Sequence, residues 1–183
     1  MDVFDAIETR VSAAKLEVPG PSQEDLERIL NSAIRAPDHG RLNPWRFVII
    51  EGAAREILGN AMAALRKRNS PAATDEQLES ERAKARRAPT IIVAAATINR
   101  QHKVPAVEQT LAVAASVQNM LLAAHALGYG AMWKTGDAAY DPIVKASLGL
   151  SGDDDIIAFV YIGTGVAKGH RKPSVLANFV TKL

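Results

Sequence analysis

The sequence predicts an α+β protein in which one long apolar helix packs against a sheet of about four strands. The stretch 105–127 is rich in Ala, Leu, Val and Met on nearly all sides, which indicates a long and largely buried helix. Shorter apolar runs rich in β-branched residues are set apart by turn formers and predict the strands. Because no internal repeat and no linker divides the chain, we expect a single domain over residues 1–183.

The first third of the chain predicts two helices followed by a strand. Apolar residues recur at helical spacing over 2–15, and the side chains expected to face inward are Val3, Ala6, Ile7, Val11 and Ala14. A second amphipathic helix is predicted over 22–35, with Ser22 as its cap. Pro37 ends it, because a proline disfavours the helical conformation in the residue before it. The apolar run at 46–51 predicts a buried strand.

The middle of the chain predicts two helices and then a central strand. A helix is expected over 52–68, and the stretch 69–74 is rich in turn formers and predicts a loop. The charged stretch 75–87 predicts a helix that is mostly exposed. Residues 90–98 are β-branched residues and alanines, a composition that suits a strand in the centre of the sheet.

The last third of the chain predicts two more strands. Gly128 and Gly130 end the long helix and open a short strand at 130–134. The elements expected after it are, in order, the helix 139–147, the strand 155–163 and, beyond a turn-rich stretch, an extended segment at 174–183.

Composition excludes several classes of protein. The 48% hydrophobic content supports a sizeable core, but no stretch approaches the roughly 20 apolar residues that span a bilayer. The first residues lack the basic region of a signal peptide, so we expect a cytoplasmic protein that does not bind membranes. The chain has no cysteine, which excludes disulfides, thiolate metal sites and a cysteine nucleophile.

The charge pattern does not favour nucleic-acid binding. The chain has 22 basic and 20 acidic residues, a formal net charge of +2. Its basic residues cluster at 66–68 and 82–87, where they alternate with Glu79, Glu81 and alanines. This pattern is typical of a solvated helix face, not of a stripe that follows phosphates.

Three patterns that could suggest other chemistry are interpreted as ordinary structure. The glycine-rich stretch 163–169 follows a strand, but the helix that a dinucleotide-binding loop must open does not follow it. The acidic run 153–155 has no His or Glu at ligand spacing, so we expect a turn and no metal site. His125 is expected to be a core histidine, and the Gly-x-Ser-x-Gly motif of hydrolases does not occur.

Polar side chains gather where predicted elements end. The loop 38–43 lies between a helix end and a core strand, which makes it a plausible binding edge. Cationic and hydroxyl groups lie at other element ends and in the tail, namely Arg10, Ser12, Arg35, Lys134, Thr135, Arg171 and Lys172. Such groups suit an anionic ligand with a phosphate and a flat ring, because cations bind the phosphate and apolar residues pack on the ring face.

Three motifs resemble the nitroreductase family of flavoproteins. The pattern Ala-Pro-(six residues)-Pro-Trp-x-Phe-Val at 36–48 resembles a turn that lies beside bound FMN, and Ala-Pro-Asp-His at 36–39 is closest to the short members of the family. Arg-Val-Ser at 10–12 resembles the Arg-Arg-Ser that opens these proteins. The stretch 128–136 is similar to the family's Gly-x-Gly-x-x-Trp turn.

The resemblance implies an FMN site and a homodimer. Arg10 and Ser12 would bind the phosphate and ribityl oxygens, Arg35 and His39 would contact the flavin, and the cofactor would also be lined by Trp133, Lys134 and Thr135. His39 would reach the flavin from the partner chain, so that the sites lie at the subunit boundary. The implied fold has a central mixed sheet of four to five strands flanked by helices, and a C-terminal segment that extends over the partner.

The resemblance also implies an activity. The expected cycle transfers a hydride from NADH or NADPH to FMN and then from FMN to a nitroaromatic, a quinone or another electron-poor small molecule. Because the cofactor carries the chemistry, no residue is assigned as acid or base. A cation near the pyrimidine edge of the ring, Lys134 or Arg35, would stabilise the anionic reduced flavin.

One departure from the family pattern leaves alternatives open. Val11 replaces the usual second basic residue, so a backbone amide, Arg171 or Lys172 supplies the missing phosphate contact, or FMN is bound more weakly. The alternative functions are a flavin-fragmenting or dehalogenating oxidoreductase on the same fold, and a non-catalytic protein that binds or stores FMN.

Overall fold

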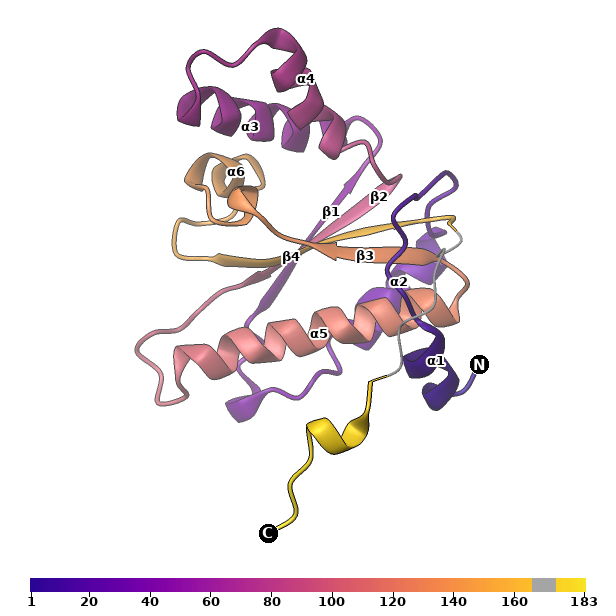
Figure 1. Ribbon diagram of the computed structural model, residues 1–183. Helices are drawn as coiled ribbons and strands as arrows, with labels where there is room; N and C mark the ends of the chain where they lie inside the picture. Colours follow the sequence, from indigo (N-terminus) through magenta and orange to yellow (C-terminus); the bar gives the residue numbers. More distant parts are fainter. Residues whose placement is uncertain (166–173) are drawn as a thin grey trace.

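A four-stranded sheet lies between two layers of helices in the computed structural model, which describes residues 1–165 and 174–183 (Figure 1). The strand order is β1-β2-β4-β3. The bounds of the strands are Trp45–Glu51 for β1, Thr90–Ala96 for β2, Gly130–Lys134 for β3 and Asp155–Gly163 for β4. The α+β class and the predicted strands are thus confirmed.

The sheet is antiparallel at every pair of neighbouring strands, so the expected mixed sheet is wrong. For the pair β1 and β2, the reason lies in the connection between them. This connection is a hairpin of two helices, α3 (Ala54–Asn69) and α4 (Asp75–Lys84). The hairpin returns the chain to the end of the sheet that it left, where Glu51 pairs with Thr90. A single crossover helix would have returned the chain to the opposite end and produced a parallel pair.

The two faces of the sheet form two hydrophobic cores. All of β2 is buried, as predicted for a central strand. Its side chains alternate between the faces, since successive residues of a strand point to opposite sides. Ile91, Val93 and Ala95 face α3 and α6 (Pro142–Ser147). Ile92, Ala94 and Ala96 face the other layer.

That other layer consists of α2 (Gln23–Ala33) and α5 (Ala106–Ala126). The 21 residues of α5 make it the longest helix of the described chain, and Val113, Val117 and Met120 on it are completely buried. However, Val107 and Leu111 are 61% and 60% exposed. The predicted burial of this helix on nearly all sides is therefore incomplete in one protomer.

The first helix is shorter than predicted. α1 covers Val3–Thr9, and the backbone becomes extended at Arg10. Beyond it, the N–H of Ala13 donates to the carbonyl of Ala131 in β3 at 3.0 Å. The free edge of β3 offers unpaired backbone groups, and the chain leaves the helix to satisfy them. Of the side chains expected to face inward only Ala6 is buried in α1, whereas Ala13 replaces Ala14 as a core residue.

Smaller differences concern the ends of elements. β2 stops at Ala96 and α4 at Lys84, each earlier than predicted, and α6 begins at Pro142 after a short 3-10 turn at Asp137–Ala139. The segment 174–183 is extended apart from one 3-10 turn, and every residue in it is exposed. In Figure 1 this segment projects away from the α5 layer. No helix in the described ranges has both the length and the apolar character needed to cross a membrane.

Asp141 joins α6 to α3. Its side chain is buried, accepts hydrogen bonds from the N–H groups of Ile143 and Val144, and pairs with Arg68. Replacing Asp141 with Ala removes the helix cap and should lower the free energy of unfolding by about 1–2 kcal/mol. Asp141→Asn keeps an acceptor at the cap and should cost less. Urea unfolding measures the stability of both variants. Equal losses of stability would show that the ion pair with Arg68, and not the helix cap, is the stabilising interaction.

Candidate functional site

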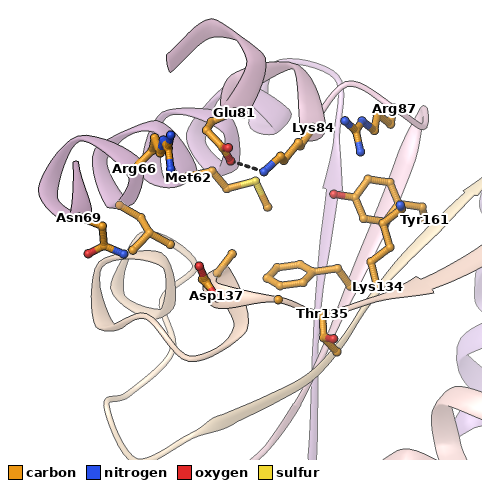
Figure 2. Close-up of a pocket in the computed structure, with 14 residues that line it drawn as sticks. Met62, Arg66, Asn69, Glu81, Lys84, Arg87, Lys134, Thr135, Asp137 and Tyr161 are labelled. Carbon is orange, nitrogen blue, oxygen red and sulfur yellow. Dashed lines mark hydrogen bonds and ion pairs between the residues drawn. The ribbon is translucent and has the colours of Figure 1, made fainter. Parts of the chain in front are cut away.

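A cavity of about 520 Å³ opens between the α3–α4 hairpin and the C-terminal end of β3 (Figure 2). Residues of both helices form one wall, and the turn that follows β3 forms another. Phe159 and Tyr161 of β4 provide a flat apolar surface. The cavity therefore has the mixed lining of a small-molecule site, with an apolar surface for a ring and polar groups around it.

Positive charge predominates in the cavity. Four cations line it, Arg66, Lys84, Arg87 and Lys134, against the two carboxylates Glu81 and Asp137. Lys84 pairs with Glu81, which neutralises one of these charges. The other cations lie on three different segments of the chain and point toward the same space (Figure 2). This arrangement favours a ligand that is anionic or that presents hydrogen-bond acceptors.

Tyr161 is a buried phenol in this cationic surrounding. Burial raises the pKa of Tyr161 to about 12, and the nearby positive charge of Arg87 opposes that rise. The Nζ atom of Lys134 lies 5.9 Å from the centre of the Tyr161 ring, within the range of a cation–π contact. The hydroxyl therefore stays protonated, and remains a hydrogen-bond donor, throughout the physiological pH range.

The structure brings four of the predicted site residues to one edge of the sheet. The Ala13–Ala131 hydrogen bond holds Ser12, and Arg10 just before it, beside β3. Lys134 follows Ala131 by three residues in an extended strand, a distance of about 10 Å. Lys134 and Thr135 line the cavity. Arg10 and Ser12 therefore lie along the same strand edge that leads to the cavity.

The side chain of Trp133 points in a different direction from that of its neighbour Lys134. Side chains alternate along a strand, so the two residues point to opposite faces of β3. The indole Nε1 of Trp133 donates to the carbonyl of Ile157 at 3.0 Å, and the side chain is not among those that line the cavity. This predicted residue therefore does not line the cavity.

Arg35 and His39 do not line the cavity. His39 pairs with Glu108 near the start of α5, whereas Thr9, the neighbour of Arg10, contacts His125 near the end of α5 at 2.8 Å. Glu108 and His125 are separated by about 25 Å along the helix axis. Arg35 follows α2, which covers the opposite face of the sheet from the cavity. His39 and Arg10 therefore lie near opposite ends of α5 in one chain.

The loop that carries His39 has an unusual backbone. Arg41 and Asn43 have φ angles of 54° and 49°, and Gly40 has a φ of 80°. The carboxylate of Asp38 stabilises the loop by accepting from the N–H of Asn43 at 2.7 Å. Left-handed non-glycine residues are uncommon and are often retained where a loop is functional.

Sequence reasoning missed three cationic residues of the cavity, Arg66, Lys84 and Arg87, because their clusters were interpreted as a solvated face. A signal for a packed face was present, since Ala85 and Ala88 recur at helical spacing between the charges and are both buried. The predicted tail cations Arg171 and Lys172, and most of the glycine-rich stretch 163–169, lie outside the described residues. His125 is half-buried and hydrogen-bonded, as its contact with Thr9 shows.

Known proteins are similar to this chain in sequence and in fold. The profile of the Nitroreductase family matches residues 7–164. "Putative NAD(P)H nitroreductase YdjA" of Escherichia coli K12 is 36% identical over 90% of this chain and 88% of its own length. A protein of Haemophilus influenzae named "Putative NAD(P)H nitroreductase" is 35% identical over the whole of both chains. The chain belongs to the nitroreductase family.

Solved structures agree with this assignment. A nitroreductase-like family protein from Bacillus cereus superposes with a TM-score of 0.84 at 22% identity and covers 100% of this chain and 96% of that one. A nitroreductase from Desulfovibrio desulfuricans in complex with FMN has a TM-score of 0.77 at 25% identity, covering 100% and 97%. The nitroreductase-like fold expected from the sequence motifs is therefore confirmed.

Proposed function

We propose that the protein is an FMN-dependent oxidoreductase that transfers electrons from NADH or NADPH to a nitroaromatic, a quinone or a similar electron-poor molecule. The proposal rests on one observation. Arg10 and Ser12 lie beside the edge of β3, and the same strand leads to the cationic cavity at Lys134. Family membership and the FMN-bound relative from D. desulfuricans support it.

The residues present fit FMN. Arg10 is half-buried and Ser12 is exposed, so both can contact a terminal phosphate and the polyol next to it. The cavity at the other end offers an apolar surface for a ring and an excess of cations for its electron-rich edge. Bound FMN supplies the hydride chemistry. The chain holds the phosphate, orients the ring and places positive charge where the reduced cofactor is negative.

We further propose that the active unit is a homodimer in which His39 of one chain contacts the FMN held by the other. The separation of about 25 Å between the His39 and Arg10 ends of α5 supports this arrangement, because a two-fold axis would bring residues from opposite ends of the helix together. The apolar side chains left exposed in one protomer support it too. These lie on α1, on α5 and in the tail, and include Phe4, Ile7, Leu111, Leu176 and Phe179.

The cofactor and the turnover test the function directly. The purified protein should be yellow, or should become so with added FMN, and the released cofactor should be FMN and not FAD. With a nitroaromatic or quinone acceptor it should oxidise NADH or NADPH continuously. Release of FAD as the main species would refute the site. FMN binding without turnover would favour a storage protein, and analysis of the products would reveal a flavin-fragmenting or dehalogenating enzyme.

Arg10 gives the proposal a test at one residue. Replacing it with Ala removes a hydrogen bond to a charged phosphate and should weaken FMN binding by about 1.5–3 kcal/mol, roughly ten- to 150-fold in Kd. Arg28→Ala is the matched control, since Arg28 is an exposed arginine on the far helical layer. Fluorescence titration of the apoprotein measures both. If Arg10→Ala and the control bind FMN with equal affinity, residues other than Arg10 bind the phosphate.

Deleting residues 174–183 tests the dimer. The deletion removes exposed apolar side chains that would cover the partner, so dimer stability and FMN retention should fall together. Phe179→Ser should produce part of this loss, and Lys182→Ser, a polar control in the same segment, should produce none. Size exclusion with light scattering, read also at the flavin absorbance, checks these results. An active, FMN-loaded monomer of the full chain would contradict the cross-subunit role of His39.

A further inference from the structure

One buried tyrosine presents its hydroxyl to the open space of the cavity. Tyr161 is only 3% exposed, and its ring packs in the core beneath α3 and α6. Its hydroxyl points into the cavity toward the side of Lys84 (Figure 2). Among the residues that the structure describes, none hydrogen-bonds to this hydroxyl. Phenylalanine would fill the same core space without a polar atom, and the hydroxyl is free to donate a hydrogen bond to a ligand bound in the cavity.

The surroundings of the hydroxyl define what that ligand must offer. Lys84 and Arg87 lie on the helical side of the cavity, and Lys134 lies over the ring of Tyr161. Ammonium, guanidinium and hydroxyl groups are all donors here, because the high pKa of Tyr161 keeps its proton in place. Glu81 is paired with Lys84. This end of the cavity therefore suits a ring edge that is rich in acceptors.

FMN has one edge of this kind. Its pyrimidine edge carries two carbonyl oxygens and the acceptor nitrogen N1, with a single N–H donor between the carbonyls, whereas its dimethylbenzene edge is apolar. If Arg10 and Ser12 hold the phosphate, the ring extends along β3 into the cavity. The donors around Tyr161 then match the pyrimidine edge.

We propose that Tyr161 donates a hydrogen bond to the pyrimidine edge of bound FMN and makes the cofactor easier to reduce. This inference rests on the proposed function. Reduction increases negative charge on that edge, and a hydrogen bond to a charged acceptor is stronger than one to a neutral acceptor. The hydroxyl therefore binds reduced FMN more tightly than oxidised FMN, and the difference raises the reduction potential.

Tyr161→Phe tests the inference because it removes the hydroxyl and keeps the ring in the core. The variant should retain its fold and most of its affinity for oxidised FMN. It should favour reduced FMN about tenfold less, which lowers the midpoint potential by about 30 mV for a two-electron couple. Tyr129→Phe is the control. Tyr129 donates to Asp25 on the opposite helical layer, so its loss should leave the potential unchanged.

A second measurement needs no change at Tyr161. The chain has three tyrosines, and fluorotyrosine labelling should give three fluorine resonances that Tyr129→Phe and Tyr140→Phe assign by elimination. FMN should shift the Tyr161 resonance. If FMN binds but neither this resonance nor the potential of Tyr161→Phe changes, the role of Tyr161 is wrong and the proposed function stands. A wild-type protein that binds no FMN would overturn both.

Discussion

The candidate site depends on the attachment of the N-terminal segment to the free edge of β3. The hydrogen bond between Ala13 and Ala131 draws Arg10 and Ser12 to the strand that ends at Lys134. Gly130 makes this close approach possible, since a Cβ at that position would lie 2.9 Å from the Cβ of Ala13. Without the attachment, the N-terminal cation and the cavity would be unrelated features of the surface.

The α3–α4 hairpin has two consequences for the protein. It makes β1 and β2 antiparallel by returning the chain to the end of β1, and it places Lys84 and Arg87 at the cavity. Ion pairs of Arg86 with Glu56 and Glu79 hold α4 against α3, although their exposure limits what each contributes. The charges on this hairpin thus serve both its packing and the electrostatics of the site.

The opposite ends of α5 separate two sets of predicted site residues. His125 holds the end of α1 near Arg10, and Glu108 holds His39. The motifs that contain Arg10 and His39 are recognisable from sequence, but only the structure shows that they lie near opposite ends of α5. The exposed apolar side chains on α1, α5 and the tail are consistent with a second copy bringing them together.

The sequence by itself determined the kind and order of most elements, because helical and strand periodicity are local and were strong over residues 90–98 and 105–127. It also determined the family, since the motifs around Arg10, Pro44 and Trp133 are short and contiguous. It misjudged the first helix. There the local pattern favoured a helix to residue 15, but the free edge of β3 drew the backbone away after Thr9.

Only the tertiary structure decided the strand directions, the place of Trp133 and the lining of the cavity. Arg66, Lys84, Lys134 and Tyr161 come from four elements or segments that are distant in sequence, and each alone has the pattern of a surface charge or a core aromatic. They become one site because the helical hairpin folds back over the β3–β4 edge. That folding is set by packing between elements, and no local pattern of residues encodes it.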